Sequence, residues 1–276
     1  MLSRFKVLTE ELDHPEGVAW GVDGRIYAGG EAGQIYAITL EGEVEEVANT
    51  GGSILGLALD AQGFIYACDE GRSEVIRVDP EKGQLEILSS GTASDPMKTP
   101  NYAAFDQAGH LYVTDSGNWQ QDNGLIFRIS PQGETTVWAR DLRRFPNGCC
   151  LSLDRSALYV VESCAPGVSR IPILADGTAG KPESVLHLPG TVPDGVALDA
   201  SGTLYVACYR PDRIYTVSPG GEAEILADDP TGVVLNTPTN VAFVGPDLGL
   251  MAVANVGEWH LLLGDIGAKG APLVYP

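Results

Sequence analysis

One phrase recurs six times along the chain, and this repeat constrains the fold more than any other feature. Each copy has a Pro or an equivalent residue, a polar residue, an apolar run, a Gly-containing turn and a second apolar run. Aligned on the residue after the Pro position, successive copies are 39, 46, 46, 47 and 45 residues apart, at Glu16, Leu55, Asn101, Asn147, Asp194 and Thr239. This spacing is typical of the four-stranded blades of a β-propeller.

Short segments rich in β-branched and aromatic residues follow each copy, and they predict strands rather than helices. Second strands include G-F-I-Y-A-C-D, G-H-L-Y-V-T-D and G-T-L-Y-V-A-C, each after a Gly turn. Third strands are expected at 74–78, 125–129 and 213–217, and fourth strands at 84–88, 134–138 and 223–226. We therefore predict an all-β fold, a six-bladed β-propeller of four-stranded antiparallel blades that forms one domain over residues 1–276.

The last copy lacks a clear fourth strand, so the ring needs a strand from elsewhere in the chain. Residues 5–9, F-K-V-L-T, resemble the fourth strand L-E-I-L-S of an earlier copy. Residues 272–275 are the competing candidate. We predict that the N-terminal strand closes the ring, because closure removes the exposed strand edges that template aggregation.

Charge and cysteine content narrow the classes of partner. Lys and Arg number 17 against 37 Asp and Glu, which gives a formal net charge of −20. Such a surface repels phosphate backbones and anionic lipids, so neither nucleic acid nor a membrane is expected as a partner. Five cysteines without C-x-x-C spacing indicate neither a disulfide framework nor a zinc cluster. We expect a cytoplasmic protein, a monomer or a small homo-oligomer.

The residues after the Pro positions carry the chemistry, because the innermost strands of a propeller all begin at one face. Four of the six bear oxygen: Glu16, Asn101, Asn147 and Asp194. Two carboxylates and two amide carbonyls are hard donors suited to Ca²⁺, with another divalent cation as the alternative. Any one of them alone also fits turn chemistry, but two buried carboxylates need a compensating charge. The pattern favours a metal site.

Second strands end at the same face, so the residues at their ends are expected around its rim: Asp69, Asp115, Glu162, Cys208 and Asn255. The long loop that starts at Asp115 carries Trp119 and is a candidate substrate wall. Taken alone, each rim residue fits a solvated loop better than a binding role. Tyr102, Phe145 and Tyr209 either line the pocket or belong to the core. The candidate substrate contacts are Asn101, Asp115, Trp119 and Tyr209.

These residues resemble the regucalcin, gluconolactonase and luciferin-regenerating-enzyme group of Ca²⁺-dependent six-bladed propellers. The likeness runs from His14 to about Gly264. E-G-V-A-W at 16–20 matches the E-G-P-x-W motif with Val18 in place of Pro, and the N-G and P-D-G motifs are present at 147–148 and 193–195. The resemblance implies a metal held by Glu16, Asn147 and Asp194, with Asn101 as a ligand or as an anchor for substrate and water.

The same resemblance implies a hydrolase that opens a lactone or a related ester. Asp194 is expected to accept a proton from the attacking water. Direct attack by Asp194 is the alternative, as proposed for the phosphotriesterase propellers that are similar at these four positions. Sugar-lactonase members tend to carry an Arg two residues before the blade-three Asn, where this chain has Thr99, so that contact with sugar hydroxyls is missing here.

Two other classes share part of the pattern. The phrase P-x-G-V-A-x-D…G-x-L-Y-V also resembles NHL-type propellers, binding modules that hold proteins or RNA on a ring face. A docking surface leaves the four converging oxygen-bearing residues unexplained, and the negative charge disfavours RNA. A strictosidine-synthase-like propeller does not need the metal site. A melting temperature raised by Ca²⁺ and lowered again by EDTA separates the hydrolase from the binding module.

Overall fold

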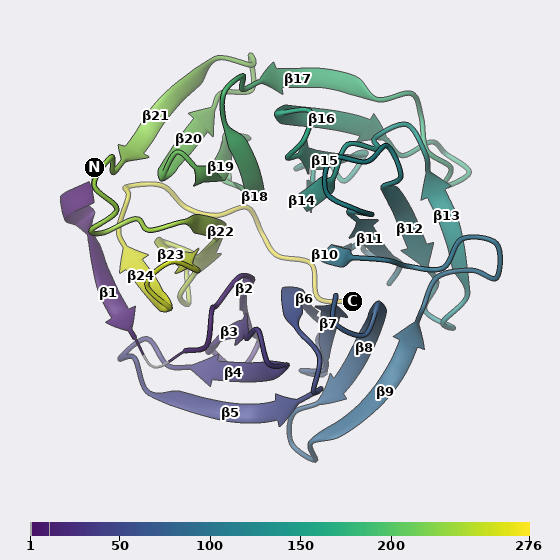
Figure 1. Cartoon of the computed structure of the whole chain (residues 1–276), viewed down its shortest axis with the longest axis horizontal. Helices are drawn as coiled ribbons and strands as arrows, with labels where there is room; N and C mark the ends of the chain where they lie inside the picture. Colours follow the sequence, from purple (N-terminus) through teal and green to yellow (C-terminus); the bar gives the residue numbers. More distant parts are fainter. Residues whose placement is uncertain (1, 11) are drawn as a thin grey trace.

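The computed structural model describes residues 2–10 and 12–276, and its strands form six four-stranded antiparallel sheets around a central axis (Figure 1). The first three blades are β2 (Val18–Trp20), β3 (Ile26–Gly29), β4 (Gln34–Ile38), β5 (Val44–Asn49); β6 (Ile54–Leu59), β7 (Ile65–Asp69), β8 (Glu74–Asp79), β9 (Gln84–Ser89); and β10 (Pro100–Phe105), β11 (Leu111–Asp115), β12 (Leu125–Ile129), β13 (Thr135–Ala139). The next two are β14 (Pro146–Leu151), β15 (Ala157–Glu162), β16 (Gly167–Pro172), β17 (Glu183–His187); and β18 (Val192–Leu198), β19 (Leu204–Arg210), β20 (Arg213–Val217), β21 (Ala223–Asp228). The predicted six-bladed propeller is confirmed.

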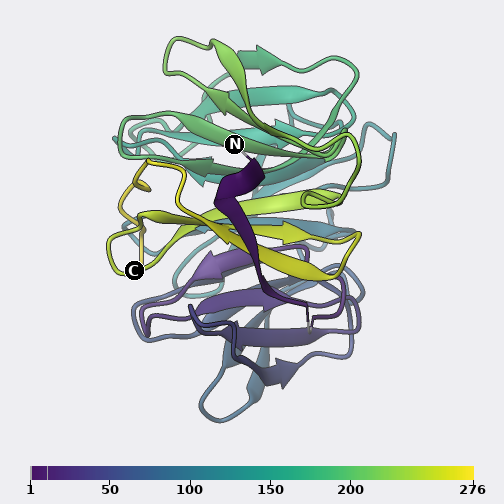
Figure 2. The ribbon, with the colours of Figure 1, turned by 90° about the vertical axis from the view of Figure 1, so that its left-hand side faces the viewer.

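The N-terminal strand closes the ring, as predicted. The sixth sheet has the order β1 (Phe5–Thr9), β24 (His260–Gly264), β23 (Leu250–Asn255), β22 (Pro238–Val244). Phe5 pairs with Gly264 and Val7 with Leu262, and the N-terminal segment runs along the outer edge of this blade (Figure 2). Residues 272–275 lie outside the strands. The one helix among the described residues, η1 (Leu2–Arg4), is far too short to cross a membrane.

The core lies between neighbouring blades. One cluster joins Tyr27 and Ile35 of the first blade to Leu57 and Ile76 of the second, and five similar clusters follow around the ring. Inner strands are therefore covered on both faces. For this reason their sequences are continuous apolar runs and do not alternate between apolar and polar residues. The outer strand β9, by contrast, is exposed over its first four residues.

The inner strands crowd together where they begin, and glycine makes this approach feasible. In four blades a glycine directly follows the residue after the Pro position. A β-carbon there would lie 2.0 to 2.7 Å from a main-chain oxygen of the next inner strand; these glycines are Gly17, Gly56, Gly148 and Gly195. The Gly in the repeated phrase therefore has a steric origin, since it brings the oxygen-bearing residues of adjacent blades close to one another.

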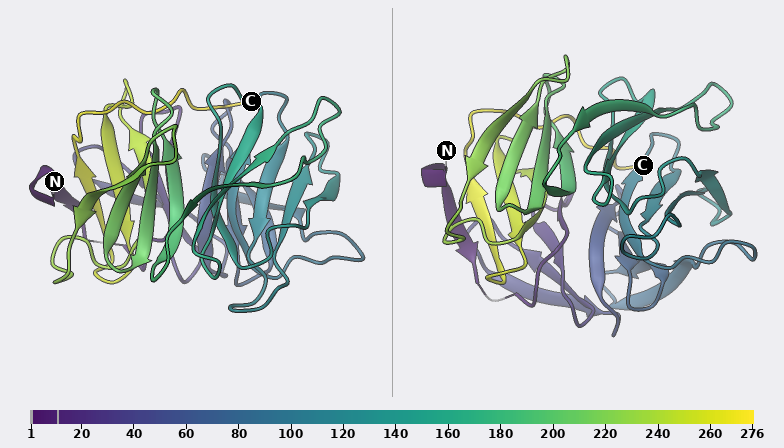
Figure 3. Two further views of the ribbon diagram at one scale, coloured as in Figure 1. Left: turned by 90° about the horizontal axis from the view of Figure 1, so that it is seen from above. Right: turned by 45° about the horizontal axis from the view of Figure 1, so that its top comes forward.

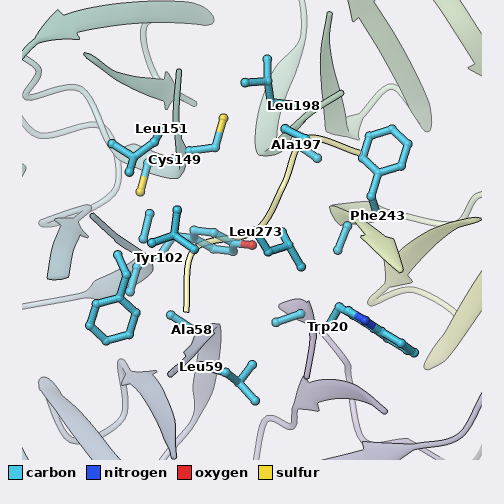
Figure 4. A pocket seen from close by; sticks show the side chains of 18 of the residues that line it. Trp20, Ala58, Leu59, Tyr102, Cys149, Leu151, Ala197, Leu198, Phe243 and Leu273 are labelled. Carbon is cyan, nitrogen blue, oxygen red and sulfur yellow. The ribbon is translucent and has the colours of Figure 1, made fainter. Parts of the chain in front are cut away.

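The C-terminal tail, residues 265–276, crosses the face of the ring where the inner strands end (Figure 3). The Tyr275 hydroxyl donates a hydrogen bond to the Trp20 carbonyl at 2.6 Å, and the Ala271 N–H donates to the Leu198 carbonyl at 2.9 Å. The tail covers an apolar cavity of about 180 Å³ whose walls come from all six inner strands (Figure 4). The face where the inner strands begin is here called the mouth. It lies at the other end of the central channel that the six inner strands enclose.

Candidate metal centre

The repeat places one residue of each blade at the mouth; these mouth residues are Glu16, Leu55, Asn101, Asn147, Asp194 and Thr239. Asn101, Asn147 and Asp194 lie near the starts of β10, β14 and β18 and are only 3 to 5% exposed. Glu16 precedes β2 and is partly buried. The Thr239 hydroxyl donates to the Glu16 carbonyl at 2.8 Å, which joins the last blade to the first. Residues far apart in the chain thus share one small volume.

The two acidic mouth residues are held in a setting that opposes their ionisation. Burial raises the pKa of Asp194 well above its usual value, the charge of Glu16 raises it further, and the Asn147 amide only partly offsets this. Burial also raises the pKa of Glu16, followed by the charges of Glu70 and Glu31. Because these carboxylates repel one another in a poorly solvated site, a cation that lets both ionise would be bound favourably.

Among the mouth residues, Asn147 Oδ1 and Asp194 Oδ1 are buried and have no donor within the described part of the chain. Asp69 Oδ2, on the rim, is a third such oxygen. A buried acceptor without a partner costs about 1–3 kcal/mol, so such atoms point to a bound ion or water. Carboxylate and amide oxygens are the ligands that Ca²⁺ prefers. The carboxylate and amide oxygens at the mouth therefore fit a divalent cation. The ligand set Glu16, Asn101, Asn147 and Asp194 stays a prediction.

The rim residues bind the protein's own main chain. Asp115 is fully buried, and its carboxylate accepts hydrogen bonds from the N–H groups of Lys98, Thr99 and Gly117 at 3.0, 2.7 and 3.2 Å. Asp69, Glu162 and Asn255 accept in the same way from the segments that enter their own blades. Asp115 thus fixes the entry to β10, and both its oxygens are already engaged. Sequence position alone does not show this structural role.

Cys208, the remaining rim residue, is a packed side chain. It is fully buried, and burial raises the pKa of its thiol to about 12. A thiol in that state is a poor nucleophile at neutral pH.

A ring of residues lies one position beyond the rim, and four of its members were not predicted from the sequence. Glu31 and Glu70 occupy this phase in the first two blades, and both raise the pKa of Glu16. Ser116 and Ser163 occupy it in the third and fourth blades and bond to the inner strand of the next blade. These positions share one phase of the repeat, one residue beyond the rim. The phase therefore predicts that they lie at this face, but it does not predict their hydrogen-bond partners.

A second cluster of ligand-type side chains lies at the edge of the mouth. His14 Nδ1 is 2.8 Å from Asp13 Oδ1 and 2.9 Å from Glu31 Oε2. Asp13 Oδ2 also accepts hydrogen bonds from the main chain of Ala32 and the side chain of Gln34. These carboxylates already contact groups of the protein that can donate hydrogen bonds, unlike Asn147 Oδ1 and Asp194 Oδ1, so contacts within the protein account for the cluster without a metal.

Aromatic side chains stand on the loops around the mouth. Trp119 is 50% exposed and contacts Phe145 edge to face, with 4.9 Å between ring centres. Trp259 is 48% exposed and packs on the His14 ring at 4.3 Å. Tyr209 is also exposed, whereas Tyr102 is buried and lines the apolar cavity under the tail. The loops thus offer apolar surface outside the polar mouth.

Fold and mouth together define a six-bladed propeller with an oxygen-lined site on its axis. The family profile described as SMP-30/gluconolactonase/LRE-like region matches residues 14–256. The chain belongs to this family.

The chain is also similar to several named proteins. The chain is 27% identical over 188 residues to a gluconolactonase of Zymomonas mobilis, covering 60% of this chain and 52% of that one. It is 30% identical over 179 residues to strictosidine synthase-like 3 of Arabidopsis thaliana, covering 60% and 45%. The chain spans about half the length of these curated relatives. The crystal structure of a calcium-binding protein, regucalcin, from Agrobacterium tumefaciens has the same fold, with a TM-score of 0.81 at 20% identity over 98% of this chain and 96% of that one.

Proposed function

We propose that this protein is a Ca²⁺-dependent hydrolase that opens a lactone or a related ester at the mouth of the ring. The observation that carries the proposal is the pair of buried oxygens without donors, Asn147 Oδ1 and Asp194 Oδ1, beside a second carboxylate. Membership of a family that includes a named gluconolactonase supports the reaction class. A protein-docking surface gives no reason for two carboxylates to be buried together.

Glu16, Asn147 and Asp194 hold the cation in this proposal, and Asn101 is a fourth ligand or an anchor for substrate and water. When bound, Ca²⁺ supplies a positive charge that polarises the carbonyl group of the substrate. Asp194 is buried at the mouth, and in the presence of the cation its carboxyl group is ionised and can act as a general base. Asp194 takes the proton from the attacking water.

Direct attack by Asp194 on the substrate is the alternative route to the same products. The two routes differ in where the oxygen of water ends after one turnover. In isotopically labelled water, the base route places the label in the first product molecule. In the nucleophile route Asp194 forms an anhydride with the substrate acyl group, and water that attacks the Asp194 carbonyl carbon breaks this anhydride and leaves the label in the Asp194 carboxylate.

The aromatic side chains around the mouth favour a substrate with an apolar face. Trp119 presents half of its surface to solvent while Phe145 holds it from behind, so its free face is available to a ligand. Tyr209 is a second proposed contact, and Asn101 a polar one. Asp115 is not included, because its oxygens are occupied by main-chain donors. We expect Trp119→Ala to raise KM for aryl and aliphatic esters more than for gluconolactone.

The test is hydrolysis of sugar lactones, aliphatic lactones, aryl esters and aryl phosphotriesters, with Ca²⁺ or with EDTA. We expect turnover of at least one class only with Ca²⁺, and a loss of at least about 100-fold in Asp194→Asn. Asp247→Asn is the matched control. Asp247 lies on the β22–β23 turn, away from the mouth, and pairs with Lys269 of the C-terminal tail. Turnover that survives in Asp194→Asn removes this residue from the mechanism. A panel without any hydrolysis supports a binding module instead.

A further inference from the structure

We propose that Ser163 orients the side-chain amide of Asn147 so that its oxygen, Oδ1, can coordinate a cation at the mouth. The inference rests on the proposed Ca²⁺ site and adds a positioning residue to it. Ser163 directly follows β15 and is only 3% exposed. It belongs to the ring of residues one position beyond the rim.

The hydrogen-bond pattern of Ser163 leaves one orientation for the amide. The Ser163 hydroxyl donates its single proton to the Pro193 carbonyl at 2.7 Å. The same oxygen lies 3.2 Å from Asn147 Nδ2 and can only accept there, because its proton is already used. The NH₂ end of Asn147 must therefore face Ser163, which directs Oδ1 away from it.

This orientation explains why Asn147 Oδ1 is buried without a donor. In the reverse orientation an NH₂ group would stand where the oxygen now lies, and its partial positive charge would repel a cation. Asp194 draws on the same NH₂ end, since hydrogen bonding from the Asn147 amide partly offsets the rise that burial causes in the pKa of its carboxyl group. Ser163 holds that end in place by its hydrogen bond and so keeps Oδ1 free.

The neighbouring blade supplies a matched control. Ser116 is fully buried, and its hydroxyl donates to the Pro146 carbonyl at 2.7 Å, the same link between blades that Ser163 makes to Pro193. This is the one hydrogen bond of the Ser116 hydroxyl within the described residues, and it does not reach a mouth side chain. Ser116→Ala therefore removes the link between blades and leaves the Asn147 amide held.

The experiment is calorimetric titration of the full chain with CaCl₂, with melting temperatures measured alongside. Ser163→Ala is expected to raise the Kd for Ca²⁺ by about 10–100-fold, and Ser116→Ala by less than about threefold, at similar losses of melting temperature. Equal Kd changes in the two variants would show that Ser163 acts only through stability, and would overturn the inference while the proposed function stands.

A second background tests orientation directly. In Asn147→Asp both side-chain ends are oxygens, so orientation no longer matters. Adding Ser163→Ala there should change the Kd by less than about threefold, in contrast to its effect with Asn147 present. An undiminished effect contradicts the positioning role. If wild-type protein binds no Ca²⁺, the inference and the proposed metal site both fail.

Discussion

Gly148 lies so close to the main chain of Asp194 that a β-carbon at residue 148 would be 2.7 Å from the Asp194 carbonyl oxygen. The two residues belong to the inner strands of adjacent blades, β14 and β18. Since Gly148 follows Asn147, this approach also sets the spacing of two of the proposed ligands. The glycine of the repeat therefore couples the packing of the ring to the geometry of the mouth.

Gly148→Ala should lower stability and weaken the site together. The added methyl group meets main-chain atoms, so the blades must separate, at a cost of about 1–3 kcal/mol. For a chain of this size we expect a melting temperature roughly 2 to 12 °C lower, and a weaker response to Ca²⁺. Gly220→Ala is the control, because Gly220 lies in an exposed turn with nothing closer than 3.6 Å to the added carbon. A variant that melts like wild type contradicts the close approach.

The N-terminal strand should be essential to the closed ring. Phe5 is 5% exposed and packs in the last interblade cluster, so Phe5→Ala is expected to cost about 3–5 kcal/mol. Val7 lies on the same strand and is 49% exposed, so Val7→Ala should change stability by less than about 1 kcal/mol. Chemical denaturation measures both. Deletion of residues 1–10 should be at least as harmful as Phe5→Ala, and an unchanged denaturation midpoint would rule out closure by this strand.

Metal-free protein should lose stability as pH rises. The pKa values of Asp194 and Glu16 are raised in the folded state above their usual 3.8 and 4.5, so the folded chain binds more protons than the unfolded chain above those values. Stability contributed by these two groups is therefore present at low pH and falls as pH rises through the raised pKa values.

We expect the unfolding free energy in EDTA, measured as wild type minus Asp194→Asn, to decrease from about pH 5 to about pH 8. Saturating Ca²⁺ should flatten or reverse this trend, since it favours the ionised carboxylates. A difference that stays constant with pH in EDTA would show that Asp194 ionises as an exposed residue does.

The architecture was predictable from the sequence because one pattern of residues recurs six times. The Pro, Gly and apolar phases of the repeat predict each inner strand, and the third strands 125–129 and 213–217 match β12 and β20 in full. Other boundaries shift by one or two residues; the fourth strand expected at 134–138 is β13 at Thr135–Ala139. Closure by residues 5–9 was predictable because a blade lacked its fourth strand.

The roles of individual polar side chains were less predictable. Asp115 and Asn147 are both oxygen-bearing residues at the same face, yet one accepts three main-chain hydrogen bonds and the other leaves an oxygen without a donor. That difference depends on side-chain direction and on neighbours contributed by other segments. Repeat phase does not encode either. Ser163 was overlooked for the same reason, since its partners lie on two different inner strands.

The path of the C-terminal tail was also beyond the sequence reasoning. Residues 272–275 have strand-like composition, but the Tyr275 hydroxyl binds the Trp20 carbonyl across the channel instead of joining a sheet. The N-terminal strand already occupies the open edge of the last blade.

The most direct test of the central claim is a crystal structure grown with Ca²⁺. We predict one cation on the ring axis, with oxygens of Glu16, Asn147 and Asp194 at about 2.3–2.6 Å and Asn147 Oδ1 facing it. An empty mouth at saturating Ca²⁺, or carboxylates turned away from the axis, would contradict it.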